Sequence, residues 1–364
     1  MTEHTPIKVA VLDDYQGLAK AHFAKLPSNF ETTYFPETLL PYNRTSTPEH
    51  VKAQLVERLR PFTIISTMRE RTPFPRELLE KLPNLKLLHS TAKRNLSLDL
   101  EAAKDLGIAV HGATELKKRN GPDSTTQHCV ALILGIARNL AHDDLAVKTG
   151  SWQTTATVGL AGKIYGSVGL GRLGLSVTKI LVLGFGMKII CWSSSLTQEA
   201  ADQKAREAGL PVEDEDGEKT FKVVSKDELF KTADVVSVHY VLSDRSRGLV
   251  SAKDLALMKP SAFFINTSRG PLVVEADLLR VLKEGKIRGA AIDVFDLEPL
   301  PADSEWRTLE WGKNGSSQVL LSPHMGYVEE ETLSKWYELT VQNIERWGRG
   351  EPLIESMTSV HVYQ

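Results

Sequence analysis

The sequence predicts an α/β protein with two doubly wound, parallel-sheet domains, and three observations indicate this. The chain has 364 residues, which at about 150 residues per domain is enough for roughly two domains. Short runs rich in β-branched residues alternate along it with amphipathic segments, the pattern of βαβ units around a parallel sheet. A glycine-rich segment in the middle of the chain follows one such run and opens a helical pattern.

The first series of strands and helices precedes residue 113. Its strands are expected at Lys8–Leu12, Phe62–Ser66, Leu85–Ser90 and Ile108–His111. Amphipathic segments such as Pro75–Lys81 and Asp99–Leu106 lie between them and predict helices. The stretch Tyr42–Glu49 is polar, contains proline and lacks periodicity, so we interpret it as a surface loop.

A long helical stretch, Ser124–Asn139, introduces the second series. Its strands are expected at Ile164–Val168, Lys188–Cys191, Val235–His239, Ala262–Asn266, Gly289–Val294 and Val319–Ser322, the strand count of a doubly wound domain. The acidic run at 213–216 is interpreted as a solvated loop tip. The last stretch, Glu329–Trp347, has helical spacing and can either cap the second domain or return to the first.

Composition and charge exclude several classes of protein. The 44 Lys and Arg balance 46 Asp and Glu, so bulk charge does not recruit nucleic acid. Cys129 and Cys191 provide neither a disulfide framework nor a four-ligand zinc site, and the histidines lack metal-ligand spacing, so no metal is expected. The longest apolar stretch, Ile180–Cys191, is shorter than the roughly 20 residues of a membrane span, and the N-terminus has no signal-peptide pattern. We therefore expect a cytoplasmic protein with no membrane partner.

The glycine-rich segment predicts a dinucleotide site. Gly169-Leu170-Gly171-Arg172-Leu173-Gly174 stands between an expected strand and a helical run, the context of a Rossmann fingerprint. In that motif the first glycine permits a tight turn, the second lets the backbone approach a pyrophosphate, and the third lets the helix pack close to the sheet. N–H groups at the helix N-terminus favour the phosphate charge. Cofactor contacts are therefore expected from the three glycines, Arg172 and Leu173.

The strand after this helix bears on the choice between NAD and NADP. It normally ends in an acid that binds the ribose hydroxyls of NAD, or has an Arg nearby for the 2′-phosphate of NADP. Here Cys191-Trp192 runs into Ser193, Ser194 and Ser195. The absent acid removes a repulsion toward the phosphate, but no Arg replaces it, and the hydroxyls can either donate to a phosphate or start the next helix. Both cofactors stay open, with a slight preference for NADP.

Three further motifs end later strands, at the edge where open α/β sheets bind ligands. They are Asn266-Thr267-Ser268-Arg269-Gly270, Asp293-Val294-Phe295-Asp296-Leu297-Glu298-Pro299 and Ser322-Pro323-His324-Met325-Gly326. Reduction of a 2-keto acid needs a cation for the carboxylate and carbonyl, and a proton donor that works near neutral pH. Arg269 and His324 supply these groups, and Glu298 can hydrogen-bond the far imidazole nitrogen and favour its protonated form.

Together these motifs resemble the D-isomer-specific 2-hydroxyacid dehydrogenase family, from Val9 to about Ile344. The resemblance implies that Arg269 binds the substrate, His324 is the acid–base and Glu298 is its partner. It implies a substrate domain (1–123 and 321–364), an inserted NAD(P)-binding domain (124–320), and an active site in the cleft between them. The expected reaction is NAD(P)H-dependent reduction of 2-keto acids to D-2-hydroxy acids and its reverse, as in glyoxylate or hydroxypyruvate reductases or broader.

The resemblance also implies binding residues and a homodimer joined through the cofactor domains. Cofactor contacts are expected from the serine run, His239, Thr267, Ser268, Asp293 and Gly326, with Asp293 near the nicotinamide carboxamide. Substrate contacts are expected from Arg69, Ala92, Lys93, Arg94 and Arg269. The chain departs from the family pattern at Gln127-His128, where Glu-His is frequent, and at His239-Tyr240-Val241, where His-x-Pro is usual.

By resemblance, the same scaffold serves formate dehydrogenases, phosphite dehydrogenases and C-terminal-binding corepressors. Formate dehydrogenases pair the histidine with a glutamine, so Glu298 argues against that activity. A corepressor-like module, which binds a dinucleotide and reads a peptide motif, keeps the same three residues. It therefore stays open as the alternative function.

Overall fold

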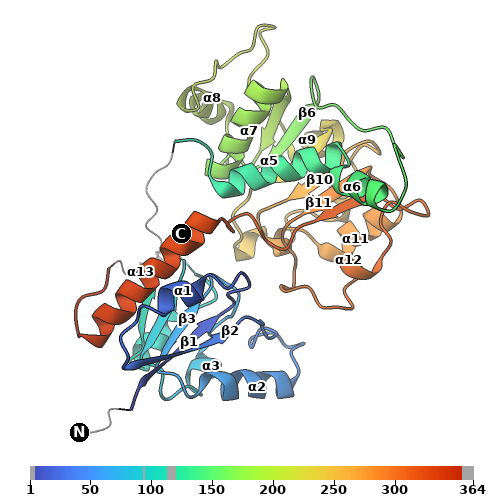
Figure 1. Ribbon diagram of the computed structural model, residues 1–364. Helices are drawn as coiled ribbons and strands as arrows, with labels where there is room; N and C mark the ends of the chain where they lie inside the picture. The colour runs from blue at the N-terminus through green and yellow to red at the C-terminus, as the bar shows by residue number, and fades with distance from the viewer. Residues whose placement is uncertain (1–4, 93–94, 113–119, 355–364) are drawn as a thin grey trace. The chain divides into compact units, whose positions relative to one another are not determined.

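The computed structural model describes residues 5–92, 95–112 and 120–354 (Figure 1). They form two compact units. Unit 1 takes the described residues of Met1–Lys118 and Glu329–Gln364, and unit 2 takes those of Arg119–Val328. Each unit has a parallel sheet, of five strands in unit 1 and seven in unit 2. This confirms the α/β fold with two parallel sheets that the sequence predicts.

The sheet of unit 1 has the strand order β2-β1-β3-β4-β5, and all neighbours are parallel. The strands are β1 (Ile7–Leu12), β2 (Phe30–Phe35), β3 (Ile64–Thr67), β4 (Leu87–Ser90) and β5 (Ala109–Gly112). Four of them confirm the predicted positions. The edge strand β2 was missed because its sequence, Phe-Glu-Thr-Thr-Tyr-Phe, contains no continuous apolar run.

Unit 1 contains the helices α1 (Ala19–Phe23), α2 (Glu49–Leu59), α3 (Arg76–Leu79), α4 (Leu100–Asp105) and α13 (Glu330–Gly348). Helices α2, α3 and α4 bury Leu55, Leu78 and Ala102 in one core with Ile65 of β3 and Leu88 of β4. The helices predicted at 75–81 and 99–106 are thus confirmed, with shorter regular parts.

The loop predicted on the surface at Tyr42–Glu49 is partly buried. Tyr42 belongs to the same core, with the ammonium groups of Lys52 and Lys81 lying 5.9 and 5.5 Å from its ring centre. The buried Thr47 hydroxyl donates to the Pro41 carbonyl at 2.6 Å. The surface prediction is confirmed for most of this loop, since residues 43, 45, 46, 48 and 49 are exposed, but it was wrong for Tyr42 and Thr47. A single buried aromatic residue in a loop produces no periodic pattern.

The C-terminal helix α13 returns to the first sheet rather than capping the second (Figure 1). Its Tyr337 ring meets Phe23 of α1 edge-on, with ring centres 6.2 Å apart. Near its end, Gly348 approaches β2 so closely that a Cβ there would lie 2.7 Å from Phe30 Cζ. Its amphipathic spacing predicted a helix, but only these contacts identify the sheet on which it packs.

A buried histidine of β4 ties this helix to the sheet. Asn343 Nδ2 donates to His89 Nε2 at 3.1 Å, and Nδ1 lies 3.3 Å from the Thr340 hydroxyl, which itself donates to the Trp336 carbonyl. The hydroxyl is therefore the acceptor, and the proton of the neutral ring is on Nδ1. Burial, and to a smaller extent nearby His111, lowers the pKa of His89 to about 3.

The buried, neutral His89 should make the free energy of unfolding fall at acidic pH. The unfolded chain binds a proton below the ordinary histidine pKa of 6.5, whereas folded His89 stays neutral until about 3. Its contribution is therefore present above 6.5 and is lost as pH falls, by about 2 kcal/mol between about pH 7 and pH 5. Urea unfolding of wild type and His89→Leu at both pH values measures this, with the smaller loss expected in the variant. Equal losses in the two proteins would contradict it.

The sheet of unit 2 has the order β12-β11-β10-β9-β6-β7-β8, again with all neighbours parallel. The strands are β6 (Ile164–Val168), β7 (Lys188–Trp192), β8 (Phe221–Val223), β9 (Val235–Val238), β10 (Phe263–Asn266), β11 (Gly289–Ile292) and β12 (Gln318–Leu321). Six confirm the prediction, and the three-residue edge strand β8 was missed because it is so short. The strand order reverses between β6 and β9, so their carboxyl ends form the switch point where such sheets bind ligands.

Helices cover both faces of this sheet (Figure 1). The helices of unit 2 are α5 (Ser124–Ala137), α6 (Leu140–Lys148), α7 (Arg172–Phe185), α8 (Gln198–Glu207), α9 (Lys226–Thr232), α10 (Ala252–Leu255), α11 (Glu275–Lys283) and α12 (Glu305–Thr308), of which α6 has no residue in the buried cores. One core joins α5, α7 and α8 to strand residues such as Tyr165 and Phe263. The other core joins helices α9, α10, α11 and α12 to strand residues that face the opposite side of the sheet, such as Phe264. With both faces covered, the central strands β9, β10 and β11 are buried at every position rather than alternating.

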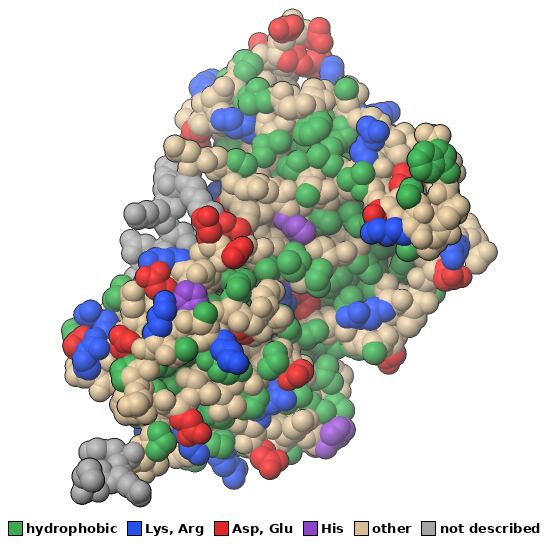
Figure 2. All heavy atoms as spheres, viewed as in Figure 1, with side chains coloured by type: hydrophobic (Ala, Val, Ile, Leu, Met, Phe, Trp, Pro, Cys, Tyr) green, Lys and Arg blue, Asp and Glu red, His purple; other side chains and the backbone are tan. Residues whose placement is uncertain are grey.

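The acidic run at 213–216 lies in the loop between α8 and β8, and all four side chains are exposed. Figure 2 shows acidic side chains gathered at the top of the view. This confirms the interpretation of the run as a solvated tip.

Within the described ranges, no helix combines the length and the apolar character that crossing a membrane requires.

Candidate active site

The predicted site residues of unit 2 stand at the carboxyl ends of its parallel strands. They are Gly169 after β6, Ser193 after β7, His239 after β9, Arg269 after β10, Asp293 after β11 and His324 after β12. Because parallel strands end at one edge, groups from distant parts of the sequence meet along that edge of a single sheet.

The glycine loop after β6 is shaped by close backbone approach. Gly169 has φ 99°, and a Cβ there would lie 2.7 Å from the His239 carbonyl oxygen. A Cβ on Gly174 would lie 2.5 Å from the Gly169 oxygen. At Gly171, the N-cap of α7, nothing lies within 4 Å of the corresponding position. Two glycines are therefore needed for packing, and the third leaves open space.

This loop fits a nicotinamide dinucleotide. The first N–H groups of the 14-residue helix α7 have no acceptor within the helix, and the open space at Gly171 admits a pyrophosphate beside them. Arg172 begins the helix, where its exposed guanidinium pairs with Asp123, and Leu173 is half-buried.

Among the described residues no group of three His, Cys, Asp or Glu side chains gathers that could hold a metal ion.

Hydroxyl groups, not an acid, follow β7. The Trp192 ring stacks on Tyr240, with centres 6.2 Å apart and an angle of 21° between the planes. The Tyr240 hydroxyl lies 2.9 Å from Ser194 Oγ and accepts the Ser194 N–H at 3.3 Å. The next helix, α8, is capped by the Thr197 hydroxyl. The serines therefore do not start that helix, which was one of the two interpretations that the sequence left open.

His239 lies beside the glycine turn in a polar group. Its Nε2 is 2.7 Å from the Tyr165 hydroxyl and 3.1 Å from Ser237 Oγ. Burial lowers the pKa of His239 to about 4, so the ring is neutral at neutral pH. The Tyr165 ring itself is fully buried. His239 thus forms a neutral wall of the dinucleotide loop.

His324 and Glu298 form a close pair. The imidazole Nδ1 lies 2.6 Å from Glu298 Oε2, while Oε1 of the same carboxylate accepts the Phe295 N–H at 2.9 Å. The carboxylate is thus fixed by its own loop and orients the imidazole. His324 has φ 56°, a left-handed conformation that costs a non-glycine residue of order 1–3 kcal/mol. The surrounding structure must therefore hold this residue.

Arg269 lies in a loop after β10 that Asn266 braces at two points. Asn266 Nδ2 donates to the Arg269 carbonyl, and Oδ1 accepts the Ser268 N–H, each at 3.1 Å. The Ser268 hydroxyl donates to the Val238 carbonyl of β9 at 2.7 Å, and Thr267 is buried. These contacts fix the backbone from which the guanidinium extends.

The Arg269 loop also touches the loop that carries Glu298. A Cβ on Gly270 would lie 2.1 Å from the Phe295 carbonyl, so any other residue would push the two loops apart. From another side, the Asp296 N–H donates to Glu275 Oε2 at 3.0 Å. The arginine and the glutamate therefore come from two loops in direct backbone contact.

Asp293 already has hydrogen-bond partners in the protein. Its buried carboxylate accepts the N–H of Met325 at 2.8 Å and that of Gly326 at 3.1 Å. These are the two residues that follow His324. Asp293 therefore binds the histidine loop, and its contact with a nicotinamide carboxamide stays a prediction.

In unit 1, Arg69 has φ 47° and is held through its backbone. Its N–H donates to Thr91 Oγ1 at 3.1 Å and its carbonyl accepts from Asn95 Nδ2 at 2.5 Å. The guanidinium lies 5.8 Å from the ring centre of Trp336 on α13. Residues held in this unfavourable region are frequent at ligand sites.

The other expected substrate residues belong to the loop after β4. Ala92 is buried, and its N–H donates to Ser90 Oγ at 3.2 Å. Lys93 and Arg94 lie outside the described residues. The substrate roles of Arg69, Ala92, Lys93 and Arg94 stay predictions.

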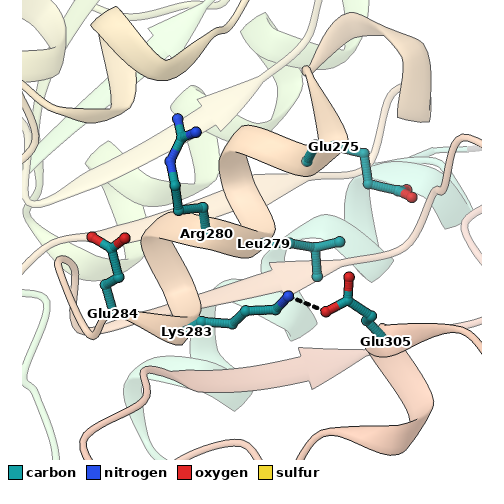
Figure 3. A pocket seen from close by; sticks show the side chains of 7 residues that line it. Glu275, Leu279, Arg280, Lys283, Glu284 and Glu305 are labelled. Carbon is teal, nitrogen blue, oxygen red and sulfur yellow. Dashed lines mark ion pairs between the residues drawn. The ribbon is translucent and has the colours of Figure 1, made fainter.

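Figure 3 shows a hollow over α11 that is separate from this chemistry. Its Lys283 pairs with Glu305, and Arg280 pairs with nearby Asp277 at 2.8 Å. These charges neutralise one another at the surface. Glu275 lines the hollow too, and its hydrogen bond from the Asp296 N–H links α11 to the loop that carries Glu298.

Comparison with known proteins identifies the family. Residues 130–326, more than half of the chain, match the NAD binding domain of D-isomer specific 2-hydroxyacid dehydrogenases. This chain belongs to that family. Its glycine loop and its His324, Glu298 and Arg269 lie within the matched region.

Relatives of this 2-hydroxyacid dehydrogenase cover most of the chain. Hydroxypyruvate reductase of Blautia hydrogenotrophica is 28% identical over 320 residues, which are 86% of this chain and 89% of that protein. Glyoxylate reductase of Thermococcus litoralis is 33% identical over 285 residues, 76% of this chain and 78% of that protein. The crystal structure of phosphoglycerate oxidoreductase from Vibrio cholerae O395 matches with TM-score 0.77 and 31% identity, covering 94% of this chain and 99% of that one.

Sequence reasoning did not assign several residues that shape the site of this dehydrogenase. Glu275 holds the Glu298 loop, Tyr165 contacts His239, and His128 contacts Asp293. Each acts across a long sequence separation, 165 residues for His128 and Asp293, so spacing carried no signal. Only the position of Gln127-His128 in the family pattern could have indicated one of them.

Proposed function

We propose that this chain reduces small 2-keto acids to D-2-hydroxy acids with NAD(P)H, and catalyses the reverse oxidation. The observation that carries the proposal is the pair of His324 and Glu298, with 2.6 Å between Nδ1 and Oε2, on loops joined to that of Arg269. Relatives named hydroxypyruvate reductase and glyoxylate reductase support the same chemistry.

In this proposal the bound dinucleotide supplies hydride to the keto carbon. His324 donates a proton to the keto oxygen as negative charge develops there, so hydride and proton together give the hydroxyl group. Glu298 keeps the imidazole oriented and stabilises its charged form. The Arg269 guanidinium binds the carboxylate and polarises the carbonyl, which fixes the substrate and stabilises the developing charge.

The direct test is initial-rate oxidation of NADH and NADPH in parallel. The panel runs from glyoxylate and hydroxypyruvate through pyruvate to branched and aromatic keto acids. Turnover on small keto acids is expected. Tight dinucleotide binding with negligible turnover across the panel would favour the corepressor-like binding module instead.

For the cofactor, we propose a preference for NADP. No carboxylate directly follows β7 to repel a 2′-phosphate. The Ser194 and Tyr240 hydroxyls lie 2.9 Å apart there, and neither caps helix α8, whose cap is Thr197. Hydroxyl and N–H groups can donate to phosphate oxygens without an arginine, although more weakly than a charged group would.

Ser194→Asp should reverse this preference. Two like charges about 4 Å apart repel by about 1 kcal/mol in bulk water and about 4 kcal/mol near a protein surface. For this exposed position we expect an intermediate cost, so that NADPH affinity falls by about 10- to 100-fold. NADH affinity should be retained or improved, because an acid can bind the ribose hydroxyls. Calorimetric titration of both cofactors measures this. The exposed Ser261, at the opposite end of the sheet before β10, provides the matched control Ser261→Asp. An equal loss for both cofactors in Ser194→Asp would refute the assignment.

We also propose a homodimer joined through unit 2, in the cytoplasm. Helix α6 has no buried residue. This helix and the segment after it carry four exposed apolar side chains: Leu140 (60% exposed), Leu145 (60%), Val147 (56%) and Trp152 (73%). A second copy of the chain would cover this apolar surface. The test compares the mass in solution of wild type with that of Leu145→Asp, which should be lower if this surface forms the interface.

The proposed cytoplasmic location has a separate basis: the two buried cysteines are free thiols, which suit a reducing compartment.

A further inference from the structure

His128 of α5 belongs to a hydrogen-bond cluster around the buried carboxylate of Asp293. Its Nε2 lies 3.1 Å from Asp293 Oδ1 and 2.9 Å from Ser322 Oγ. The same Oδ1 accepts the Met325 N–H, and Oδ2 accepts the Gly326 N–H. Because an ionised carboxylate only accepts hydrogen bonds, the proton of His128 that faces it is on Nε2, and the Ser322 oxygen is a second acceptor.

This cluster brackets the catalytic histidine on both sides in sequence. Ser322 precedes His324 by two residues, and Met325 and Gly326 follow it directly. The loop also packs on the first turn of α5, since a Cβ on Gly326 would lie 3.2 Å from Thr125 Cγ2 and 3.4 Å from Asp293 Oδ2. The left-handed backbone of His324 is thus held by groups that contact its neighbours rather than its own ring.

The orientation of Asp293 depends in turn on its donors. Its side chain is 1% exposed and that of His128 is 23% exposed. Two of the three donors are N–H groups of the loop that needs to be fixed, and the third, His128, is on a different element. A carboxylate held only by the loop would move with it, whereas a donor on a 14-residue helix provides an independent anchor.

We propose that His128 is a positioning residue for His324. By donating to Asp293 from α5, it fixes the carboxylate that binds the Met325 and Gly326 N–H groups, and thereby keeps the imidazole at Glu298. The kinetic consequence rests on the proposed function. The structural consequence, protection of two backbone N–H groups, does not.

The test compares three variants. His128→Leu keeps a similar volume but removes the donor, His128→Gln restores an N–H donor of similar reach, and Gln127→Leu is the matched control. Gln127 is the exposed neighbour on the same helix, and its amide donates to the Pro122 carbonyl and not to Asp293.

Hydrogen exchange of the Met325 and Gly326 amides is measured in each protein without ligand, together with kcat and KM for the best keto acid. His128→Leu should speed exchange at both amides and lower kcat by about 10- to 100-fold, the usual effect of losing a supporting hydrogen bond at a site. KM should change much less, because Arg269 is untouched. His128→Gln should recover part of both effects, and Gln127→Leu should match wild type.

Wild-type exchange at Met325 and Gly326 in His128→Leu would overturn the proposal, as would equal losses in Gln127→Leu. If His128→Leu does not fold, His128→Asn, whose amide is too short to reach the carboxylate, makes the same comparison. If the wild-type protein reduces no keto acid, the proposed function fails, and amide exchange alone decides on the role of His128.

Discussion

Replacing His324 by alanine should lower kcat for keto-acid reduction by about 10²- to 10⁴-fold, the range typical of losing a general acid. The keto oxygen acquires negative charge as the hydride arrives, and without the imidazole it must take its proton from water. We do not expect the Glu298 carboxylate, which lies 2.6 Å from Nδ1 in the intact pair, to replace the imidazole, because an ionised carboxylate has no proton to donate.

Steady-state kinetics with the best substrate of the panel measure this effect. Calorimetric cofactor affinity serves as the check on folding, since the glycine loop lies on other strands and should bind as in wild type. His50 is an exposed histidine of α2 in unit 1, and His50→Ala provides the control for histidine removal as such. A kcat for His324→Ala close to wild type would mean that another group donates the proton.

Arg269→Lys should be nearly as damaging, although the charge is kept. A guanidinium presents a planar fork of N–H donors that can bind the carboxylate and the carbonyl together. An ammonium is a single point charge at the end of a shorter side chain. Losing one such preorganised donor toward developing charge costs about 10²- to 10³-fold in kcat. Because Asn266 and Gly270 fix the backbone on either side, the loop cannot shift to bring the lysine closer.

The measurement is kcat/KM across the same keto acids, with Arg247→Lys as the control. Arg247 is an exposed arginine that lies 3.8 Å from Asp244 outside this site, so its variant should match wild type. The pair of His324 and Glu298 is intact in Arg269→Lys, so the pH dependence of the remaining activity should keep its shape. Near-normal kcat/KM in Arg269→Lys would place the carboxylate clamp elsewhere.

The sequence by itself determined most of the framework of this protein. Apolar runs bounded by turns predicted ten of the twelve strands that the structure describes, because a strand buried on both faces is apolar throughout. The strands it missed, β2 and β8, are edge strands, one alternating and one only three residues long. The sequence also predicted that the glycine loop, Arg269, Glu298 and His324 follow strands, and the structure confirms these positions; their roles stay predictions.

Only the tertiary structure decided what depends on groups far apart in sequence. It showed that α13 packs in the first unit, that Thr197 caps α8 while Ser194 contacts Tyr240, and that His128 contacts Asp293. A local pattern reports which residues share a face of their own helix or strand, but not which other element that face meets. The left-handed backbone of His324 shows the same limit. Its conformation is unfavourable locally, and its neighbours are held by groups far away in sequence: His128 of α5 contacts Ser322, and the Asp293 carboxylate after β11 accepts the Met325 N–H.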